Sequence, residues 1–175
     1  DLIDRVLPDL VSKDIKVISN AGGVNPEACR DALLEVAKAK GIDIKIGIII
    51  GDNIYDKLND FTTNGVDFKN LETGEDFNLV KDEVYSANVY IDSFCIARAL
   101  DEGAQIVLAG RVSDPGLALG PAIHEFGWKS DQIDLIAAGT LAGHITECGA
   151  QCTGGNYSRW SEIEDLVNIG YPIIE

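Results

Sequence analysis

Residues 137–157 bring histidine, glutamate and cysteine together at spacings that suit chemistry. The residues concerned are His144, Glu147, Cys148 and Cys152. If the segment is helical, these side chains share one stripe, because residues three and four apart stack on a helix surface. His144 and Glu147 then suit general acid–base catalysis, since imidazole changes its protonation near neutral pH. A core helix would carry Leu or Ile at such positions, so the stripe indicates a functional surface.

Other interpretations of this stripe stay open. Cys148 could be a nucleophilic thiolate activated by His144, or it could be core packing, as free cysteine often is. A metal-dependent enzyme could instead combine His144 and Glu147 with an acidic residue at a strand end. That residue would be Asp52 or Asp114. One helix supplies only part of a ligand set, and the His-x₃-Cys-x₃-Cys spacing matches no standard zinc motif, so we predict no metal and no cofactor.

Residues 110–115, with the sequence GRVSDP, form a second chemical motif. Arg111 follows an apolar strand candidate, and its permanently charged guanidinium can hold a carboxylate or phosphate through two parallel hydrogen bonds. Asp114 could pair with Arg111, but we expect it to cap the helix that begins near Pro115. Arg111 is therefore predicted to be an anion clamp in the catalytic site.

Glycines and short polar residues beside these motifs are predicted to bind substrate. Paired glycines let the backbone approach a ligand closely, and free amides at a helix start attract carboxylate or phosphate. Asparagine, aspartate and glycine are also ordinary turn residues, so each position alone has a structural explanation. The predicted substrate-binding residues are Asn20, Gly22, Gly23, Asp52, Asn88, Asp114, Gly154, Gly155 and Asn156.

Alternating strands and helices must position these residues. Short apolar runs predict strands at 15–19, 43–50, 84–90 and 105–109. Periodic segments predict helices at 26–40, 53–61, 92–102, 116–126 and 131–147, and residues 62–82 form a turn-rich excursion. This order predicts an α/β fold with a mostly parallel sheet and helices on both faces, a Rossmann-like layered arrangement.

The predicted strands end in polar residues. Asn20, Asp52, Asn88 and Arg111 each lie at or near the carboxyl end of a different strand. In parallel α/β sheets, ligands bind in the crevice beyond these strand ends. We therefore expect the polar strand ends to form one site, with the His144 stripe as a wall of the same crevice.

Composition and charge limit the classes of partner. The net charge of −15 argues against nucleic acid and anionic membranes, which both require basic patches. No apolar run approaches the roughly 20 residues of a membrane helix, and the first ten residues lack the layout of a secretory signal. Four scattered cysteines fit reduced thiols better than a disulfide framework. We expect a cytoplasmic protein with a small-molecule substrate.

Long stretches of the chain resemble a known family. The stretches are SNAGGVNP (19–26), YSANVY (85–90), GAQIVLAGRVSDPGLALGPAIHEFGW (103–128) and AAGTLAGHITECGAQCTGGNY (137–157). They are similar to the acyclic terpene utilisation protein A family, and the resemblance covers almost the whole chain. It implies that residues 1–175 are a single α/β domain, a fragment of that family's longer N-terminal domain and truncated at both ends.

The resemblance implies a catabolic role on a coenzyme A thioester or on a branched or hydroxylated carboxylic acid. Combined with the motifs, it predicts a lyase- or hydratase-type enzyme in which Arg111 holds an anion and His144 with Glu147 moves the proton. The second hypothesis is a non-catalytic binding or assembly subunit of an acyl-CoA-processing complex. Either way we expect a homo-oligomer or a complex subunit.

Overall fold

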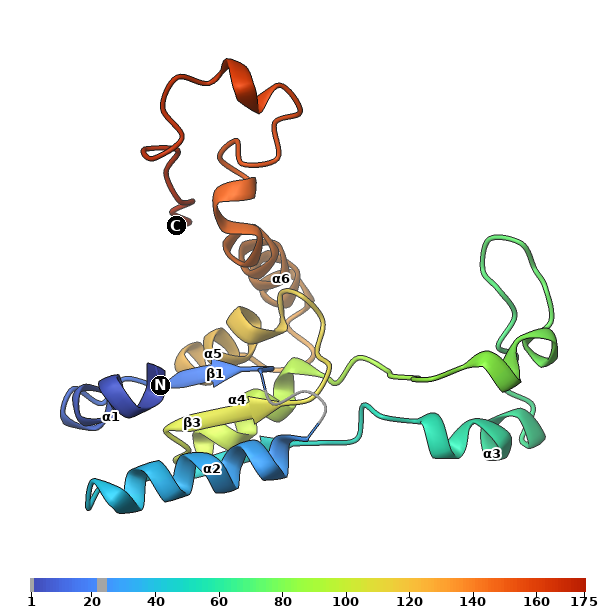
Figure 1. The fold of residues 1–175 in the computed structure, drawn as a ribbon, viewed down its shortest axis with the longest axis horizontal. Coiled ribbons are helices and arrows are strands. Elements are labelled where there is room, and N and C mark those ends of the chain that lie inside the picture. Colours follow the sequence, from blue (N-terminus) through green and yellow to red (C-terminus); the bar gives the residue numbers. More distant parts are fainter. Residues whose placement is uncertain (1, 22–24) are drawn as a thin grey trace.

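The computed structural model describes residues 2–21 and 25–175 of the chain. Its centre is a sheet of three parallel strands in the order β1-β3-β2 (Figure 1). The strands are β1 (Val17–Ser19), β2 (Ile46–Ile49) and β3 (Ile106–Ala109). Ile106 of β3 pairs with Val17 on one side and with Ile46 on the other. This arrangement confirms the predicted α/β class and the parallel sheet.

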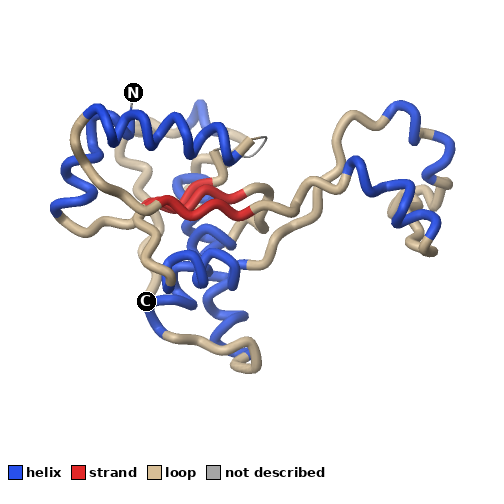
Figure 2. Tube along the Cα trace, turned by 90° about the horizontal axis from the view of Figure 1, so that it is seen from below, coloured by secondary structure: helices blue, strands red, loops and turns tan. Residues whose placement is uncertain are grey.

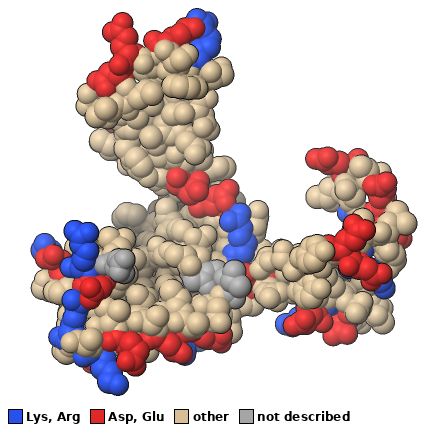
Figure 3. Space-filling model, viewed as in Figure 1, with Lys and Arg blue, Asp and Glu red and all other residues tan. Residues whose placement is uncertain are grey.

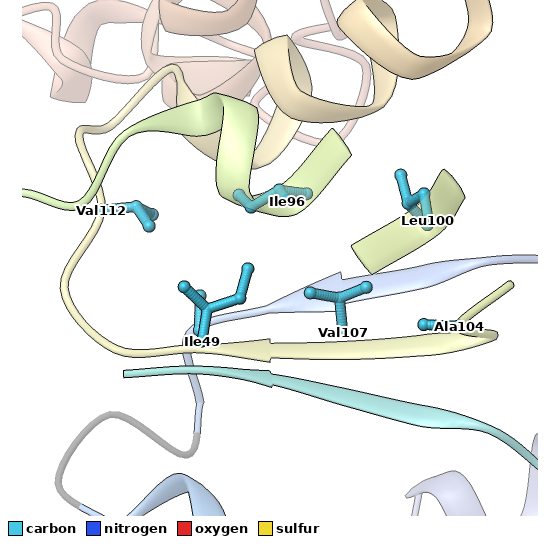
Figure 4. Packing of buried hydrophobic residues seen from close by; sticks show 7 residues of the cluster. Ile49, Ile96, Leu100, Ala104, Val107 and Val112 are labelled. Atoms are coloured by element: carbon cyan, nitrogen blue, oxygen red, sulfur yellow. The ribbon is translucent and has the colours of Figure 1, made fainter. Parts of the chain in front are cut away.

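Helices cover both faces of this sheet (Figure 2). The helices of this layered body are α1 (Leu2–Ser12), α2 (Pro26–Ala39), α4 (Ser93–Asp101), α5 (Gly116–Phe126) and α6 (Ile133–Cys148), whereas α3 (Leu58–Thr63) lies away from the sheet. Successive residues of β3 point to opposite faces and enter two separate cores. Val107 packs with Ile96 and Leu100 of α4 (Figure 4), whereas Ile106 belongs to a cluster with Leu7 of α1. α5 packs on α4, and α6 packs on α5.

Most predicted elements are confirmed, with small shifts at their ends. The helices predicted at 26–40, 92–102, 116–126 and 131–147 correspond to α2, α4, α5 and α6. The segment 53–61 forms a 3₁₀ turn, η1 (Tyr55–Lys57), that continues into α3. α1 is absent from the predicted elements. Pro8 lies inside it, where a proline normally interrupts a helix, but Leu7 is buried against the sheet.

The strand predicted at 84–90 is wrong. Among the described residues, this segment and its neighbour make isolated bridges, Asn53 with Asn88 and Ile91 with Val112. Its alternating pattern resembles a half-buried strand, but Tyr85 is almost fully exposed, so no second layer covers it. The segment instead returns the chain from an excursion to the sheet.

That excursion, residues 53–88, is the arm of the molecule. It projects away from the sheet and its helices (Figure 1). Besides η1 and α3 it contains two further 3₁₀ turns, η2 (Phe77–Leu79) and η3 (Lys81–Glu83). Phe68 lies between Phe61 and Phe77, at ring-centroid distances of 6.4 and 5.4 Å, and this aromatic cluster is the interior of the arm.

Residues 149–175 form a C-terminal segment beyond α6. It contains the 3₁₀ turns η4 (Gly149–Gln151) and η5 (Trp160–Glu162). The Tyr171 hydroxyl donates a hydrogen bond to the Thr146 carbonyl and holds the segment against α6. Within the described part of the chain, every helix is too short or too polar to cross a membrane.

Candidate functional site

A cavity of about 780 Å³ lies at the carboxyl edge of the sheet. Each strand contributes to it at its end: Asn20 follows β1, Asp52 follows β2 and Arg111 follows β3. The two ends of the arm, residues 53–55 and 85–88, form its neck and supply further lining residues. The lining residues are Asn20, Pro26, Glu27, Ile50, Gly51, Asp52, Asn53, Tyr55, Tyr85, Ser86, Asn88, Tyr90, Gly110 and Arg111. The structure thus brings together four polar residues that the sequence places at strand ends.

Asp52 holds these segments together. The residue is 5% exposed, and its Oδ2 accepts hydrogen bonds from the Asn88 side-chain amide at 2.8 Å and from the Arg111 backbone amide at 2.9 Å. The carboxylate also lies directly against Gly110, where a Cβ atom would collide with it. Asp52 therefore joins the ends of β2 and β3 to the neck of the arm.

Backbone hydrogen bonds continue this junction. The Val89 amide donates to the Asp52 carbonyl at 2.8 Å, and the Ile91 amide donates to the Arg111 carbonyl at 2.9 Å. These contacts hold residues 87–91 along the strand ends without forming a strand. Asn88 reaches the cavity for this reason, although the element predicted to carry it does not form.

Arg111 is the one Lys or Arg among the described residues that line the cavity. Its guanidinium lies 4.8 Å from the centroid of the Tyr90 ring, donates to the Tyr90 hydroxyl at 3.3 Å and pairs with Asp114 at 3.2 Å. The hydrogen bond to Tyr90 and the electrostatic interaction with the same side chain, and then the charge of Asp114, raise the pKa of Arg111 above its ordinary value. The side chain keeps 40% of its surface exposed and lines the cavity, so an oriented cation is accessible from solvent there.

Asp114 does not cap α5, and the capping prediction is wrong. The residue before the helix is Pro115, and no side chain caps its first amides. Asp114 instead pairs with Arg111 and does not line the cavity. An incoming carboxylate would compete with this ion pair, which is exposed and therefore weak.

The stripe on α6 lies outside the cavity lining. α6 packs through two buried glycines: a Cβ on Gly139 would lie 2.6 Å from the Trp128 ring, and one on Gly143 would lie 2.7 Å from the Pro115 carbonyl. His144 and Glu147 are exposed. The face of α6 that carries Gly139 and Gly143 is therefore the one that packs against the rest of the fold. A catalytic role for His144 and Glu147 stays a prediction.

Cys148 lies on the same stripe and is half-buried. Loss of solvent, and then the neighbouring Glu147 carboxylate 3.6 Å away, raise the pKa of its thiol. A raised pKa leaves less thiolate at neutral pH, which disfavours Cys148 as a nucleophile.

We expect Cys148 to react slowly with iodoacetamide near neutral pH and faster as the pH rises above its raised pKa. Glu147→Gln should speed the reaction, because it removes a negative charge that opposes the thiolate. Peptide mass spectrometry can follow each cysteine separately. Fast alkylation of Cys148 at neutral pH, unchanged in Glu147→Gln, would contradict this account.

The remaining predicted residues lie apart from the cavity or outside the described residues. Gly154, Gly155 and Asn156 belong to the C-terminal segment, where the Asn156 amide donates to the Gln151 side chain at 3.1 Å. Gly22 and Gly23 lie outside the described residues. Within residues 2–21 and 25–175, no three His, Cys, Asp or Glu side chains gather as a metal site would require, and His144, Glu147 and Asp52 are not grouped.

Three tyrosines of the cavity are absent from the predicted site. Tyr55, Tyr85 and Tyr90 all line it and are exposed. Two of them flank Asn88 within the stretch YSANVY, so their spacing around a predicted site residue was a usable signal. Tyrosine supplies both an apolar ring and a hydroxyl, and these three rings widen the range of groups that the cavity can contact.

Comparison with known proteins identifies a family. Neither a curated protein nor a solved structure matches the sequence. The family model described as "Acyclic terpene utilisation family protein AtuA" matches residues 1–175, the whole chain. The chain therefore belongs to the acyclic terpene utilisation (AtuA) family.

Proposed function

We propose that the cavity at the carboxyl edge of the sheet binds a carboxylic acid substrate of acyclic terpene breakdown, and that Arg111 holds its carboxylate. The observation that carries this proposal is the guanidinium of Arg111, fixed by Tyr90 and Asp114 at the end of the central strand. Arginine binds carboxylates through paired hydrogen bonds. The reaction we propose is of the lyase or hydratase type.

Charge favours a free acid over a coenzyme A thioester within this class. Among the lining residues that the structure describes, the cavity offers one cation, beside the carboxylates of Glu27 and Asp52. One arginine suffices for one carboxylate. Coenzyme A carries several phosphate charges, which a chain of net charge −15 would repel.

The test is Arg111→Gln in the full chain, with butanoate binding measured by calorimetry. We expect affinity to fall at least tenfold, because hydrogen bonds to a charged group contribute about 1.5–3 kcal/mol. Arg111→Lys should keep part of the affinity, since lysine keeps the charge but loses the paired geometry.

Arg98→Gln is the matched control. Arg98 lies on α4, is exposed and pairs with Glu102 at 3.1 Å, away from the cavity. We expect this variant to bind butanoate as the unmodified chain does. Equal losses of butanoate affinity in Arg98→Gln and Arg111→Gln would mean that Arg111 acts only through the net charge of the chain. That result would contradict its proposed role in binding the carboxylate.

A second candidate function, a subunit of an acyl-CoA-processing complex, is supported by the surface of α6. Its charged residues are Asp134 and Glu147, and the surface formed by α6 and the C-terminal segment is mostly uncharged in Figure 3. Ile133 and Leu141 are 67% and 63% exposed. Such apolar exposure is typical of interfaces. Co-purification in a stable mixed complex without turnover would favour this function.

A further inference from the structure

A second cavity, of about 560 Å³, lies inside the arm. Its walls are mainly apolar and include Leu58, Phe68, Phe77, Leu79, Val80 and Val84. Cavities of this size, lined by aliphatic and aromatic side chains with few polar groups, are typical of sites for small apolar ligands. Two of its lining residues, Asn88 and Val89, also belong to the junction made by Asp52.

The arm cavity adjoins the site at the sheet edge. Ser86 and Asn88 line both cavities. Asn88 is held by Asp52 at 2.8 Å, so the shared wall is fixed to the strand ends. A ligand with two chemically different ends could therefore occupy both cavities at once.

The charged residues of the two cavities determine the orientation in which such a ligand would bind. The charged residues in the arm cavity are Glu75 and Asp76, which repel a carboxylate. The sheet-edge cavity has Arg111. The charged end would thus lie beside Arg111 and the hydrocarbon end in the arm.

We propose that the arm cavity binds the hydrocarbon chain of the acid whose carboxylate Arg111 holds. This inference rests on the proposed function. Leu79 and Val80 are 71% and 50% exposed although they line the cavity, so a hydrocarbon chain would remove apolar surface from water on binding. The arm is then a substrate-binding element that selects acids by chain length.

The test compares butanoate, octanoate and uncharged octanol by calorimetry on the full chain. Each buried methylene should tighten binding about twofold to fourfold, so octanoate should bind at least tenfold tighter than butanoate. Leu79→Gln should weaken octanoate about tenfold and leave butanoate unchanged. Leu71→Gln is the control, since Leu71 is also on the arm and fully exposed but does not line the cavity.

Three results would overturn the inference. One is equal affinity for the two acids, and another is the same effect of Leu79→Gln and Leu71→Gln on octanoate. The third is self-association of the chain that Leu79→Gln abolishes while both acids bind unchanged, because the arm cavity would then be a protein contact.

If Arg111 does not hold the carboxylate, so that the proposed function is wrong, the binding measurements give a different result. Arg111→Gln would then leave the binding of both acids unchanged. Octanol binding that Leu79→Gln weakens would in that case still support a hydrocarbon site in the arm. Octanol binding that Leu79→Gln does not alter would overturn it.

Discussion

Asp52→Ala should lower the free energy of unfolding by about 2–3 kcal/mol and detach the neck of the arm from the strand ends. The variant removes the carboxylate that accepts hydrogen bonds from Asn88 and from the Arg111 amide, and bonds to a charged acceptor are the stronger ones. The position is 5% exposed, so water replaces the lost acceptor poorly. Urea denaturation measures the stability, and butanoate calorimetry measures the site.

The matched control for this prediction is Asp43→Ala. Asp43 is exposed just before β2, and its side chain makes no hydrogen bond among the described residues. We expect a change within about 0.5 kcal/mol, as for most surface positions. Asp52→Asn keeps an acceptor oxygen and should lose less stability than Asp52→Ala. If Asp52→Ala and Asp43→Ala lower the free energy of unfolding equally little, Asp52 does not organise the site.

Gly120→Val should destabilise the fold by about 2–3 kcal/mol through the contact between α4 and α5. A Cβ at this position would lie 2.6 Å from Cβ and Cγ2 of Ile96 and 3.1 Å from the Ser93 carbonyl. Ile96 is fully buried between the sheet and α5, so it has no free space to move into. Overpacking a tight core costs about 1–3 kcal/mol, and the added Cβ with its two methyl groups places this variant at the upper end.

Ala118→Val tests whether this loss comes from packing alone. Ala118 lies on the exposed side of the same helix, so the variant carries the helical cost of a β-branched residue without the collision. We expect the free energy of unfolding to change by less than about 1 kcal/mol, as measured by thermal or urea unfolding. Valine has a higher helix propensity than glycine, so helix propensity cannot lower the stability of Gly120→Val. A loss in Gly120→Val no larger than that in Ala118→Val would therefore contradict the predicted collision with Ile96.

The layered body of the fold is largely predictable from local pattern. The apolar run of β3 and the periodic segment of α5 correspond to a buried strand and a helix with the predicted bounds or nearly so. Both elements lie in the core, where local preference and burial agree. The strand ends follow from the parallel sheet, and Asn20, Asp52 and Arg111 reach one cavity for that reason.

The arm is less predictable, because long-range contacts and not local pattern define it. Asn88 reaches the cavity through its bond to Asp52, which lies 36 positions earlier in the chain. The local pattern of residues 84–90 favours an extended backbone but does not distinguish a strand from an extended connector. In the structure only Val84 and Ala87 of this segment are partly buried, which is not the alternating burial of a strand. Tyr90 becomes a site residue through its stacking on Arg111, and that contact also depends on the junction.

The α6 stripe illustrates a second limit of sequence patterns. Spacing correctly places His144, Glu147 and Cys148 on one helix, but it does not say which face packs. Gly139 and Gly143 settle that, because small residues allow the close approach to Trp128 and Pro115. His144 and Glu147 are consequently exposed and Cys148 half-buried, and all three lie outside the cavity lining.

The structure of the full chain with octanoate bound would test the central claim most directly. We expect the carboxylate within hydrogen-bonding distance of the Arg111 guanidinium, with the Asp114 ion pair opened, and the hydrocarbon chain beside Leu79 and Val80. A carboxylate bound away from Arg111, or a sheet-edge cavity left empty at saturating octanoate, would contradict the account.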